Sequence, residues 1–463
     1  MPYSLPPLGI VFRFASVVAL LLRLALGVSS VKADVSLPDI FSDHMVLQAE
    51  TAAPVWGWAD PGEQVSVRMG AYQESVAADA TGRWKVKLAG LRTGDAGTLN
   101  VSGKNTLTIS DVVVGEVWVC SGQSNMAGVV GGQEKAPKER PLLRFFREQS
   151  SGAGEPQHKC KGSWEVCVPG SIRNFSGTAY FFGKELHEQL NRPVGLIVSA
   201  VGGTQIELWM PRPPRKIQTG AGSLFDGKIA PLVGYGMRGV IWYQGESNAR
   251  NPEQGLRYQH QLTSLITEWR ERWGQGDFPF GWVQLPNFSG EKFEGWCEVR
   301  ESMLKTLSVP DTGMAVTVDY TGDSKNIHPA NKEVVGHRLG LWALARVYGR
   351  DIPYSGPVWV SQEKKGDTLA CLFRHCDGGL KSRDGELKGF MIAGEDRQWH
   401  PAAARIEGET VLVSSAEVRH PVAVRYAWAP NPCCNLVNGA GLPASPFRTD
   451  DWPTGPQDNA PRP

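Results

Sequence analysis

One hydrophobic run, Val112 to Cys120, limits most strongly what this chain can fold into. The run is rich in valine, a β-branched residue, and this composition predicts a strand buried on both faces of a parallel sheet. It stops at Ser121-Gly122-Gln123, and Ser124 follows at once. Glycine permits a sharp turn, and open α/β sheets bind ligands at the carboxyl ends of their strands. Ser124 is therefore expected at a ligand-binding edge, either as a nucleophile or as a simple helix cap.

Size, charge and the N-terminal segment narrow the class of protein further. The 463 residues predict two or three domains, and the formal net charge of +1 without a basic tract argues against a nucleic-acid partner.

Residues 1–33 are expected to be a signal peptide. Arg13 precedes an apolar stretch from Phe14 to Val28, and Val31-Lys32-Ala33 offers small residues at a cleavage spacing. Arg23 interrupts the stretch, so a stable membrane span is not expected, although an uncleaved anchor is the alternative. We expect a periplasmic or secreted protein.

The eight cysteines fit export without specifying a disulfide framework. Cys160 and Cys167 share a loop, as do Cys371 and Cys376, and each pair would close a small ring. Eight cysteines allow many connectivities, so no pairing is assigned. The chain contains no CxxC pair and no HExxH helix, so no metal site is expected.

The spacing of apolar residues divides the chain into three parts and a tail. Short alternating runs predict an antiparallel β domain over 34–111 and a second one over 351–450, while 451–463 is a Pro-rich tail. Between them, 112–350 alternates strands with helical periodicity, as in a parallel sheet covered on both faces. The further strands expected there are Val194–Val201, Arg238–Tyr243, Phe278–Leu285 and Met314–Asp319. Ser176 is expected to cap one of the helices, and Gly274 to follow another.

Polar clusters follow three of these strands. They are Gly122-Gln123-Ser124-Asn125, Gly202-Gly203-Thr204 and Gln244-Gly245-Glu246-Ser247-Asn248. In a parallel sheet the three clusters meet at one edge. Glycine backbone N–H groups and a side-chain amide such as that of Gln244 are the parts of an oxyanion hole, so we predict a site there.

His328 is the candidate base. It precedes Pro329, which suits the first position of a helix, so the imidazole is expected beside the last strand on a rigid element. A lone histidine near a helix start is otherwise a surface or capping residue. The other histidines considered, His158, His187, His260 and His337, have no polar cluster nearby. Met126 replaces the second glycine of G-x-S-x-G, which argues against the nucleophile elbow of α/β-hydrolases.

Together these motifs resemble the sialate O-acetylesterases of the SGNH hydrolase superfamily. The resemblance is carried by Gly-Gln-Ser124-Asn-Met, Gly202-Gly203-Thr204, Trp242-Tyr-Gln244-Gly-Glu246-Ser-Asn248 and Ile327-His328-Pro329, with flanking matches such as Trp56-Gly-Trp58. It implies a flavodoxin-like three-layer α/β/α SGNH hydrolase domain with accessory β-sandwich-like domains. It also implies hydrolysis of an acetyl ester on a sugar or glycan, without metal or organic cofactor.

The resemblance also assigns roles residue by residue. Ser124 would be the nucleophile and His328 the general base. The oxyanion would be held by the Ser124 N–H, a glycine of the Gly202-Gly203 pair and the Gln244 amide, where superfamily members often have asparagine. The family pattern places an aspartate three residues before the histidine, but that residue here is Lys325. Asp323 is favoured as the acid, with Asp319 and Glu246 as rivals and a Ser–His dyad as another option. Glu246 is alternatively a substrate contact.

The sequence leaves the substrate open. Nothing in the motifs identifies the sugar, so an esterase for acetyl-xylan or another polysaccharide is an alternative. A non-catalytic carbohydrate-binding protein on an esterase scaffold is an alternative of another class.

Overall fold

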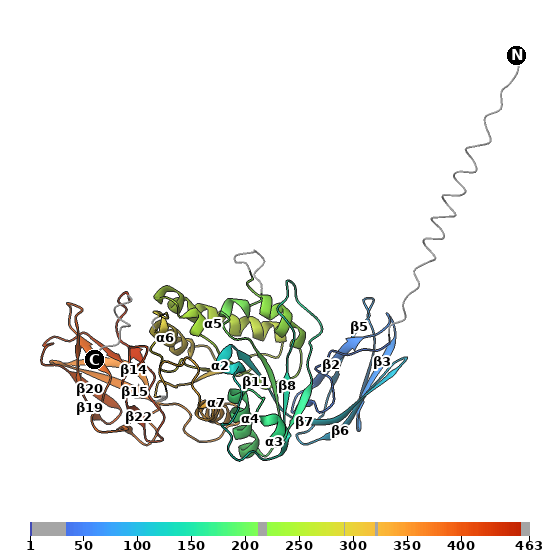
Figure 1. Cartoon of the computed structure of the whole chain (residues 1–463), viewed down its shortest axis with the longest axis horizontal. Helices are drawn as coiled ribbons and strands as arrows, with labels where there is room; N and C mark the ends of the chain where they lie inside the picture. The colour runs from blue at the N-terminus through green and yellow to red at the C-terminus, as the bar shows by residue number, and fades with distance from the viewer. Residues whose placement is uncertain (2–33, 212–219, 291, 320–322, 455–463) are drawn as a thin grey trace.

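The computed structural model describes residue 1 and residues 34–211, 220–290, 292–319 and 323–454. The molecule is elongated, with β units at its two ends and an α/β unit between them (Figure 1). The predicted signal peptide, apart from Met1, and the end of the predicted tail lie outside the described residues.

The central sheet is built around β7 (Thr106–Gly122), whose second half is the buried run that the sequence predicts. Strands follow one another across it in the order β13-β12-β11-β7-β10-β8-β9. Their bounds are β8 Arg140–Arg147, β9 Trp164–Cys167, β10 Val194–Ala200, β11 Gly239–Tyr243, β12 Phe280–Val283 and β13 Thr312–Ala315. Every neighbouring pair is parallel except β8 and β9. Without the β8–β9 hairpin, which the sequence did not predict, the chain order is 2-1-3-4-5. This flavodoxin-like order confirms the predicted fold class.

Helices cover both faces of this sheet, because its strands are apolar on both faces. The helices α4 (Gly177–Leu190) and α7 (Lys332–Arg346) pack on one face, where Trp118 contacts Phe182 and Trp342 edge to face. The helices α5 (Pro252–Trp273) and α6 (Trp296–Thr306) cover the other face, where Trp242 packs on Trp269. Figure 1 shows the sheet between these two helical layers. Two buried aromatic cores therefore hold the strand ends in place.

The helix ends show which local predictions hold. Ser176 Oγ accepts the N–H of Ala179 at 3.2 Å, and Gly274 ends α5 in the left-handed conformation, as predicted. The prediction that Pro329 begins a helix is wrong. Asn331 is the cap of α7, since its side chain accepts the N–H groups of Glu333 and Val334, and the helix begins at Lys332. His328 therefore lies in a loop before the helix.

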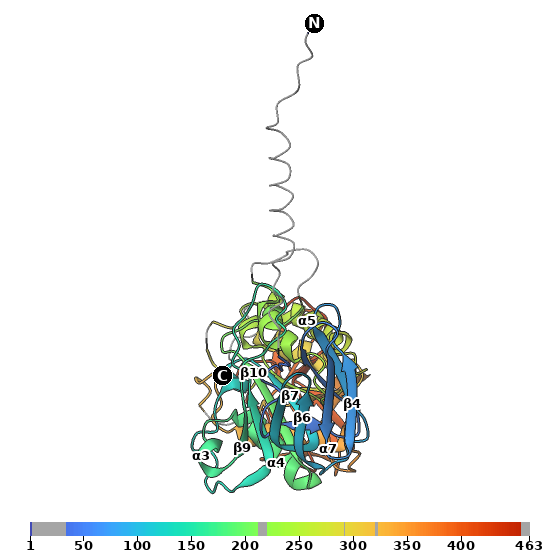
Figure 2. The same ribbon diagram turned by 90° about the vertical axis from the view of Figure 1, so that its right-hand side faces the viewer.

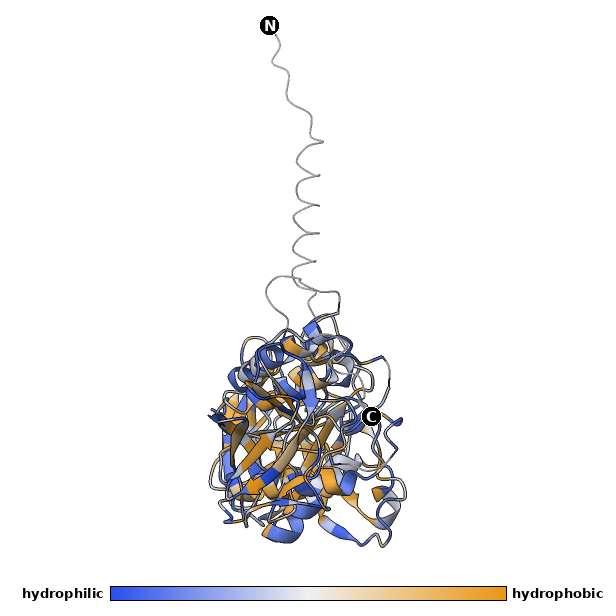
Figure 3. Cartoon of the chain, turned by 90° about the vertical axis from the view of Figure 1, so that its left-hand side faces the viewer, coloured by the Kyte–Doolittle hydropathy of each residue, from blue (hydrophilic) through white to orange (hydrophobic). Residues whose placement is uncertain are grey.

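The two β units flank the α/β unit. At the N-terminal end, β3, β4 and β6 form antiparallel pairs, β6 continues onto the first half of β7, and β2 and β5 form a separate pair. Figure 2 views this end of the molecule, and Figure 3 views the opposite end, where apolar strands lie inside hydrophilic edges. The bounds of the first unit are β1 Val46–Gln48, β2 Ala53–Trp58, β3 Gln64–Met69, β4 Tyr72–Ala77, β5 Arg83–Leu88 and β6 Ala96–Ser102.

The C-terminal β unit contains two four-stranded antiparallel sheets and a two-stranded one. Its strands are β14 Val358–Lys365, β15 Thr368–Arg374, β16 Leu380–Ser382, β17 Phe390–Ala393, β18 Trp399–Pro401, β19 Ala403–Glu407, β20 Thr410–Ser414, β21 Ala423–Tyr426, β22 Leu436–Asn438 and β23 Phe447–Arg448. The predicted boundary at residue 111 falls inside β7, a strand shared by the N-terminal β unit and the central sheet. The exact domain limits therefore remain a prediction.

The structure also bears on the cysteines, on membrane spans and on metal sites. All eight cysteines are unpaired, including the two pairs that share loops. Within the described residues, no helix is long and apolar enough to cross a membrane. The same part of the chain holds no group of three His, Cys, Asp or Glu side chains suited to a metal ion.

Candidate active site

Ser124 lies at the carboxyl end of β7, where the strand turns into the short helix α2 (Ser124–Ala127). The turn depends on Gly122, whose φ is +136° and where a Cβ would lie 2.1 Å from the Tyr243 carbonyl oxygen. The same carbonyl accepts the N–H of Gln123 at 2.9 Å. The N-cap of α2 is Gln123, so Ser124 is not a capping residue. Its side chain remains available for another contact.

That contact is with His328. The Nε2 atom of the imidazole lies 2.8 Å from Ser124 Oγ, although the two residues are 204 positions apart. The His328 backbone N–H donates to Asn326 Oδ1 at 2.9 Å, which shapes the loop. Partial burial, and then the positive charge of Lys332, lowers the pKa of His328. The imidazole is therefore neutral near pH 7, the form that accepts a proton from a hydroxyl.

Of the two glycines predicted for the oxyanion hole, Gly202 lies beside the nucleophile. A Cβ at Gly202 would be 3.4 Å from Ser124 Cβ, and Gly203 has a φ of +72°. The preceding Val201 N–H donates to the Gly122 carbonyl at 3.1 Å, which joins the turn after β10 to the turn after β7. Backbone of two strand ends therefore borders Ser124.

Gln244 is also at this edge, but its amide is already used. Gln244 is fully buried, and Nε2 donates to Asn248 Oδ1 at 2.8 Å, the Thr204 carbonyl at 3.0 Å and Gln123 Oε1 at 3.1 Å. Tyr258 donates to its Oε1 at 2.9 Å. An oxyanion role for Gln244 stays a prediction, one that requires its amide to leave an internal acceptor.

The three candidate acids lie in different surroundings. Asp323 is exposed and its Oδ1 accepts the Lys325 N–H at 2.9 Å; within the part of the chain that the structure describes, no hydrogen bond joins it to His328. Asp319 is bound by Arg338, at 2.7 and 2.8 Å, and by Arg383 at 2.6 Å. Burial raises the pKa of Asp319, but these arginines outweigh it and the pKa is lowered. Its carboxylate therefore serves an ion-pair network in this structure.

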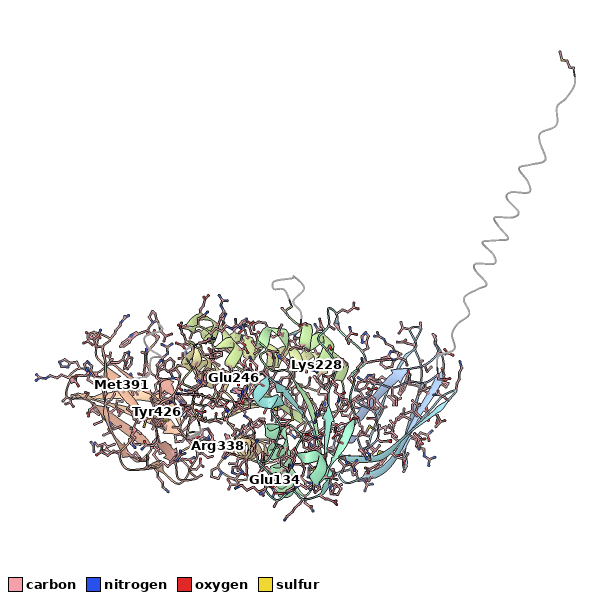
Figure 4. All side chains as sticks on the ribbon, in the orientation of Figure 1. Glu134, Lys228, Glu246, Arg338, Met391 and Tyr426 are labelled. Carbon is pink, nitrogen blue, oxygen red and sulfur yellow. The ribbon has the colours of Figure 1, made fainter. Side chains whose placement is uncertain are left out.

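Glu246, the third candidate, belongs to a buried network that the sequence did not predict. Asn125 Nδ2 donates to Glu246 Oε1 at 2.6 Å and to the Ile327 carbonyl at 3.0 Å, while Lys332 Nζ donates to Asn125 Oδ1 at 2.5 Å. At most 4% of each side chain of the Asn125, Glu246 and Lys332 trio is exposed. Figure 4 labels Glu246 in the middle of the molecule, next to the ribbon of α2. Asn125 follows Ser124 and Ile327 precedes His328, so the network ties the two site segments together.

Burial and charge act in opposite directions inside this network. Burial raises the pKa of Glu246, against the Asn125 hydrogen bond that lowers it. Burial lowers the pKa of Lys332 to about 8, and Glu246 only partly offsets this. No motif pointed to Lys332, because a lysine near a helix start is ordinarily exposed.

A serine bonded to a neutral histidine, at a strand edge bordered by glycines, is an arrangement suited to acyl transfer. On this fold it defines a hydrolase of the SGNH type. A family model described as carbohydrate esterase, sialic acid-specific acetylesterase, matches residues 114–343. The chain is 30% identical to human sialate O-acetylesterase over 88% of its own length and 91% of the relative's. The mouse enzyme is also 30% identical, over 88% and 92%. The chain belongs to the sialate O-acetylesterase family, a family of carboxylic ester hydrolases.

A solved structure supports the same assignment. The crystal structure of a carbohydrate acetylesterase from Xanthomonas citri superimposes with a TM-score of 0.86 and 39% sequence identity. It covers 90% of this chain and 100% of that one, so the similarity includes the flanking β units.

Proposed function

We propose that this protein is a serine esterase that hydrolyses O-acetyl esters on carbohydrates, with O-acetylated sialic acid as its preferred substrate. The observation that carries the proposal is the 2.8 Å hydrogen bond between Ser124 Oγ and His328 Nε2. Family membership and the carbohydrate acetylesterase with the same architecture support the acetyl ester and the sugar.

The mechanism is two-step acyl transfer. His328 Nε2 takes the proton of Ser124 as Oγ attacks the acetyl carbonyl, and a tetrahedral oxyanion forms. We assign its stabilisation to the Ser124 N–H, to a glycine N–H of the Gly202-Gly203 pair and to a side-chain amide from Gln244. When the intermediate collapses, the sugar oxygen leaves with the proton held by His328. Water then attacks the acetyl-enzyme with His328 again as base, and acetate leaves with Ser124 restored.

The third member of the triad is proposed to be Asp323. It is close in sequence to His328, and a rotation of the exposed loop that carries it would bring its carboxylate toward Nδ1, where it would fix the tautomer. Glu246 is proposed to act through Asn125 instead, because its hydrogen bond is to that amide. A site without the Asp323 contact would work as a Ser–His dyad.

We further propose that the protein is exported after removal of residues 1–33. The support is the sequence of that segment, an interrupted apolar stretch before small residues. Sequencing the N-terminus of the protein recovered from its native host would test this, with a mature chain beginning near Asp34 as the expected result.

The esterase proposal is tested with a substrate panel and two variants. Acetate release is measured from 9-O-acetyl sialic acid, acetyl-xylan and p-nitrophenyl acetate, using the full chain, Ser124→Ala and His328→Ala. We expect release by the native chain to be fastest per acetyl group from the sialic acid, and both variants to lose more than about 10³-fold in kcat. Faster acetate release from acetyl-xylan would identify the protein as a polysaccharide acetylesterase instead. Equal rates for the native chain and Ser124→Ala would favour a binding protein without catalysis.

A further inference from the structure

A cleft lies between the N-terminal β unit and the α/β unit. Its volume is about 290 Å³, and none of the proposed catalytic residues lines it. One wall is the β2–β5 pair, which contributes Trp56, Trp58 and Trp84. The other wall comes from the α/β unit and includes His158 and Pro231. Clefts at the junction of two units are common ligand sites.

Two indoles form one side of this cleft. Trp56 and Trp58 are two residues apart on β2, so their side chains lie on the same face of the strand. Trp56 is held in place by edge contacts with Phe41, at 4.7 Å between ring centroids, and with Tyr235 at 6.4 Å. Both tryptophans are only partly buried. A fixed, accessible pair of rings of this kind suits the apolar face of a sugar ring.

Positive charge surrounds the same indoles. Lys159 Nζ lies 4.6 Å from the Trp58 ring centroid, and Lys85 Nζ lies 5.8 Å from that of Trp56. Arg83 is paired with Trp58 across the two strands. In the described parts of the chain, no ion pair joins these three cations to a carboxylate. Partial burial, and then nearby Lys87, lowers the pKa of Lys85, as expected for a cation that no anion stabilises.

One carboxylate does line the cleft, but it is engaged locally. Asp79 Oδ1 accepts the Thr81 N–H at 2.8 Å, the Thr81 hydroxyl at 2.6 Å and the Arg83 N–H at 3.0 Å. These bonds shape the turn before β5 and, together with the nearby charge of Arg83, lower the pKa of Asp79. The third indole, Trp84, is 3% exposed and alternates with Arg83 and Lys85 along β5, so it packs on the opposite, buried face of the pair. The cleft therefore combines two accessible indoles with three cations that no ion pair joins to a carboxylate among the described residues.

We propose that this cleft binds a carboxylate-bearing sugar residue of a glycan, at a distance along the chain from the acetyl ester. The ring of the sugar packs on Trp56 and Trp58, and its carboxylate meets Lys85, Lys159 and Arg83. Sialic acids and uronic acids share this chemistry. The inference deepens the proposed function, on which it rests for the glycan, and it assigns the N-terminal β unit a part in holding polymeric substrate.

Binding is measured on the full chain carrying Ser124→Ala, so that no turnover occurs. Polysialic acid, polygalacturonic acid and neutral xylan are titrated by calorimetry. We expect binding of an acidic polymer, with polysialic acid and polygalacturonic acid distinguishing the two sources of carboxylate. Adding Trp58→Ala or Lys159→Glu should weaken that binding about tenfold, whereas Trp58→Phe should weaken it less. Lys161→Glu, an exposed change of the same charge two residues away, is the matched control and should bind as before.

Hydrolysis of p-nitrophenyl acetate separates this inference from the esterase proposal. With Ser124 intact, Trp58→Ala and Lys159→Glu should keep kcat/KM within about twofold of the native chain, which would show that both variants fold. Xylan binding as tight as that of the acidic polymers, or acidic-polymer binding unchanged by both substitutions, would overturn the cleft assignment. If the native chain hydrolysed no ester, the calorimetric result would still test the cleft, because binding is measured without turnover.

Discussion

At the residue scale, Asn125 connects the two segments that carry the proposed catalytic pair. Its amide bonds Glu246, Lys332 and the carbonyl of Ile327, so its orientation is fixed from three sides. Breaking one of these bonds would leave a buried polar group unpaired, which costs about 1–3 kcal/mol. The geometry between Ser124 and His328 therefore depends on residues that do not touch the ester.

Lys332 is expected to set the acid limb of the pH profile. His328 works as a base only when neutral, so kcat/KM falls as pH decreases through its pKa. Partial burial lowers that pKa most and the charge of Lys332 adds to this, so Lys332→Met should raise the pKa and move the acid limb to higher pH. The measurement is kcat/KM for p-nitrophenyl acetate against pH. Lys325→Met, an equal charge change on an exposed residue of the loop that carries His328, should leave the limb in place. An unmoved limb in Lys332→Met would show that the charge does not act on His328.

Gln244 is expected to be needed for structure as well as rate. Replacing it with alanine removes the donor to Gln123, Thr204 and Asn248 and leaves a cavity at a fully buried position. We expect Gln244→Ala to lose about 2–3 kcal/mol of unfolding free energy and at least about 10²-fold in kcat. Chemical denaturation and kinetics would be measured on the same preparation. A loss of kcat with unchanged stability would identify Gln244 as an oxyanion donor only.

At the scale of elements, the turn between β7 and α2 places the nucleophile. Gly122→Ala would bring a Cβ to 2.1 Å from the Tyr243 carbonyl in a backbone region that disfavours side chains. We expect the variant to lose about 3 kcal/mol or more of stability, with activity falling as Ser124 shifts. Thermal unfolding and esterase assays check this. Gly132→Ala, where a Cβ meets nothing within 4 Å, is the control and should change neither. A stable, active Gly122→Ala protein would contradict the role given to this turn.

The elements also show what the sequence could predict. The strand before Ser124 and the cap at Ser176 follow from local composition, and the meeting of three strand ends follows from parallel topology. The β8–β9 hairpin escaped prediction because its pairing depends on residues separated by a long loop. The Lys332 contact escaped because a lysine near a helix start is ordinarily exposed and its partner Asn125 is 207 positions away. Pro329 suited a helix start, but the Asn331 side chain supplied a better cap.

At the scale of the whole molecule, buried polar contacts dock the C-terminal β unit on the α/β unit. Arg300 of α6 donates to the carbonyls of Ala429 and Pro430 at 2.8 and 3.0 Å. Arg448 of β23 donates to Glu301 of α6 at 2.9 Å, and it also contacts Asp450 at 3.2 Å. The side chains of Arg448, Glu301 and Asp450 are at most 6% exposed. Charges this deeply buried at a junction favour one fixed arrangement of the two units.

Removing Arg448 should therefore weaken the whole molecule and not only its C-terminal end. Arg448→Ala leaves Glu301 and Asp450 buried with fewer partners, and breaking a buried pair costs about 3–5 kcal/mol. Because Lys305 and Arg425 still bind these carboxylates, we expect the lower end of that range, measured by denaturant unfolding. Arg405→Ala removes a highly exposed ion pair with Glu407 in the same β unit and should cost less than about 1 kcal/mol. If both variants lost the same small amount, the two units would be held by apolar packing instead, and limited proteolysis of Arg448→Ala would release no separate C-terminal fragment.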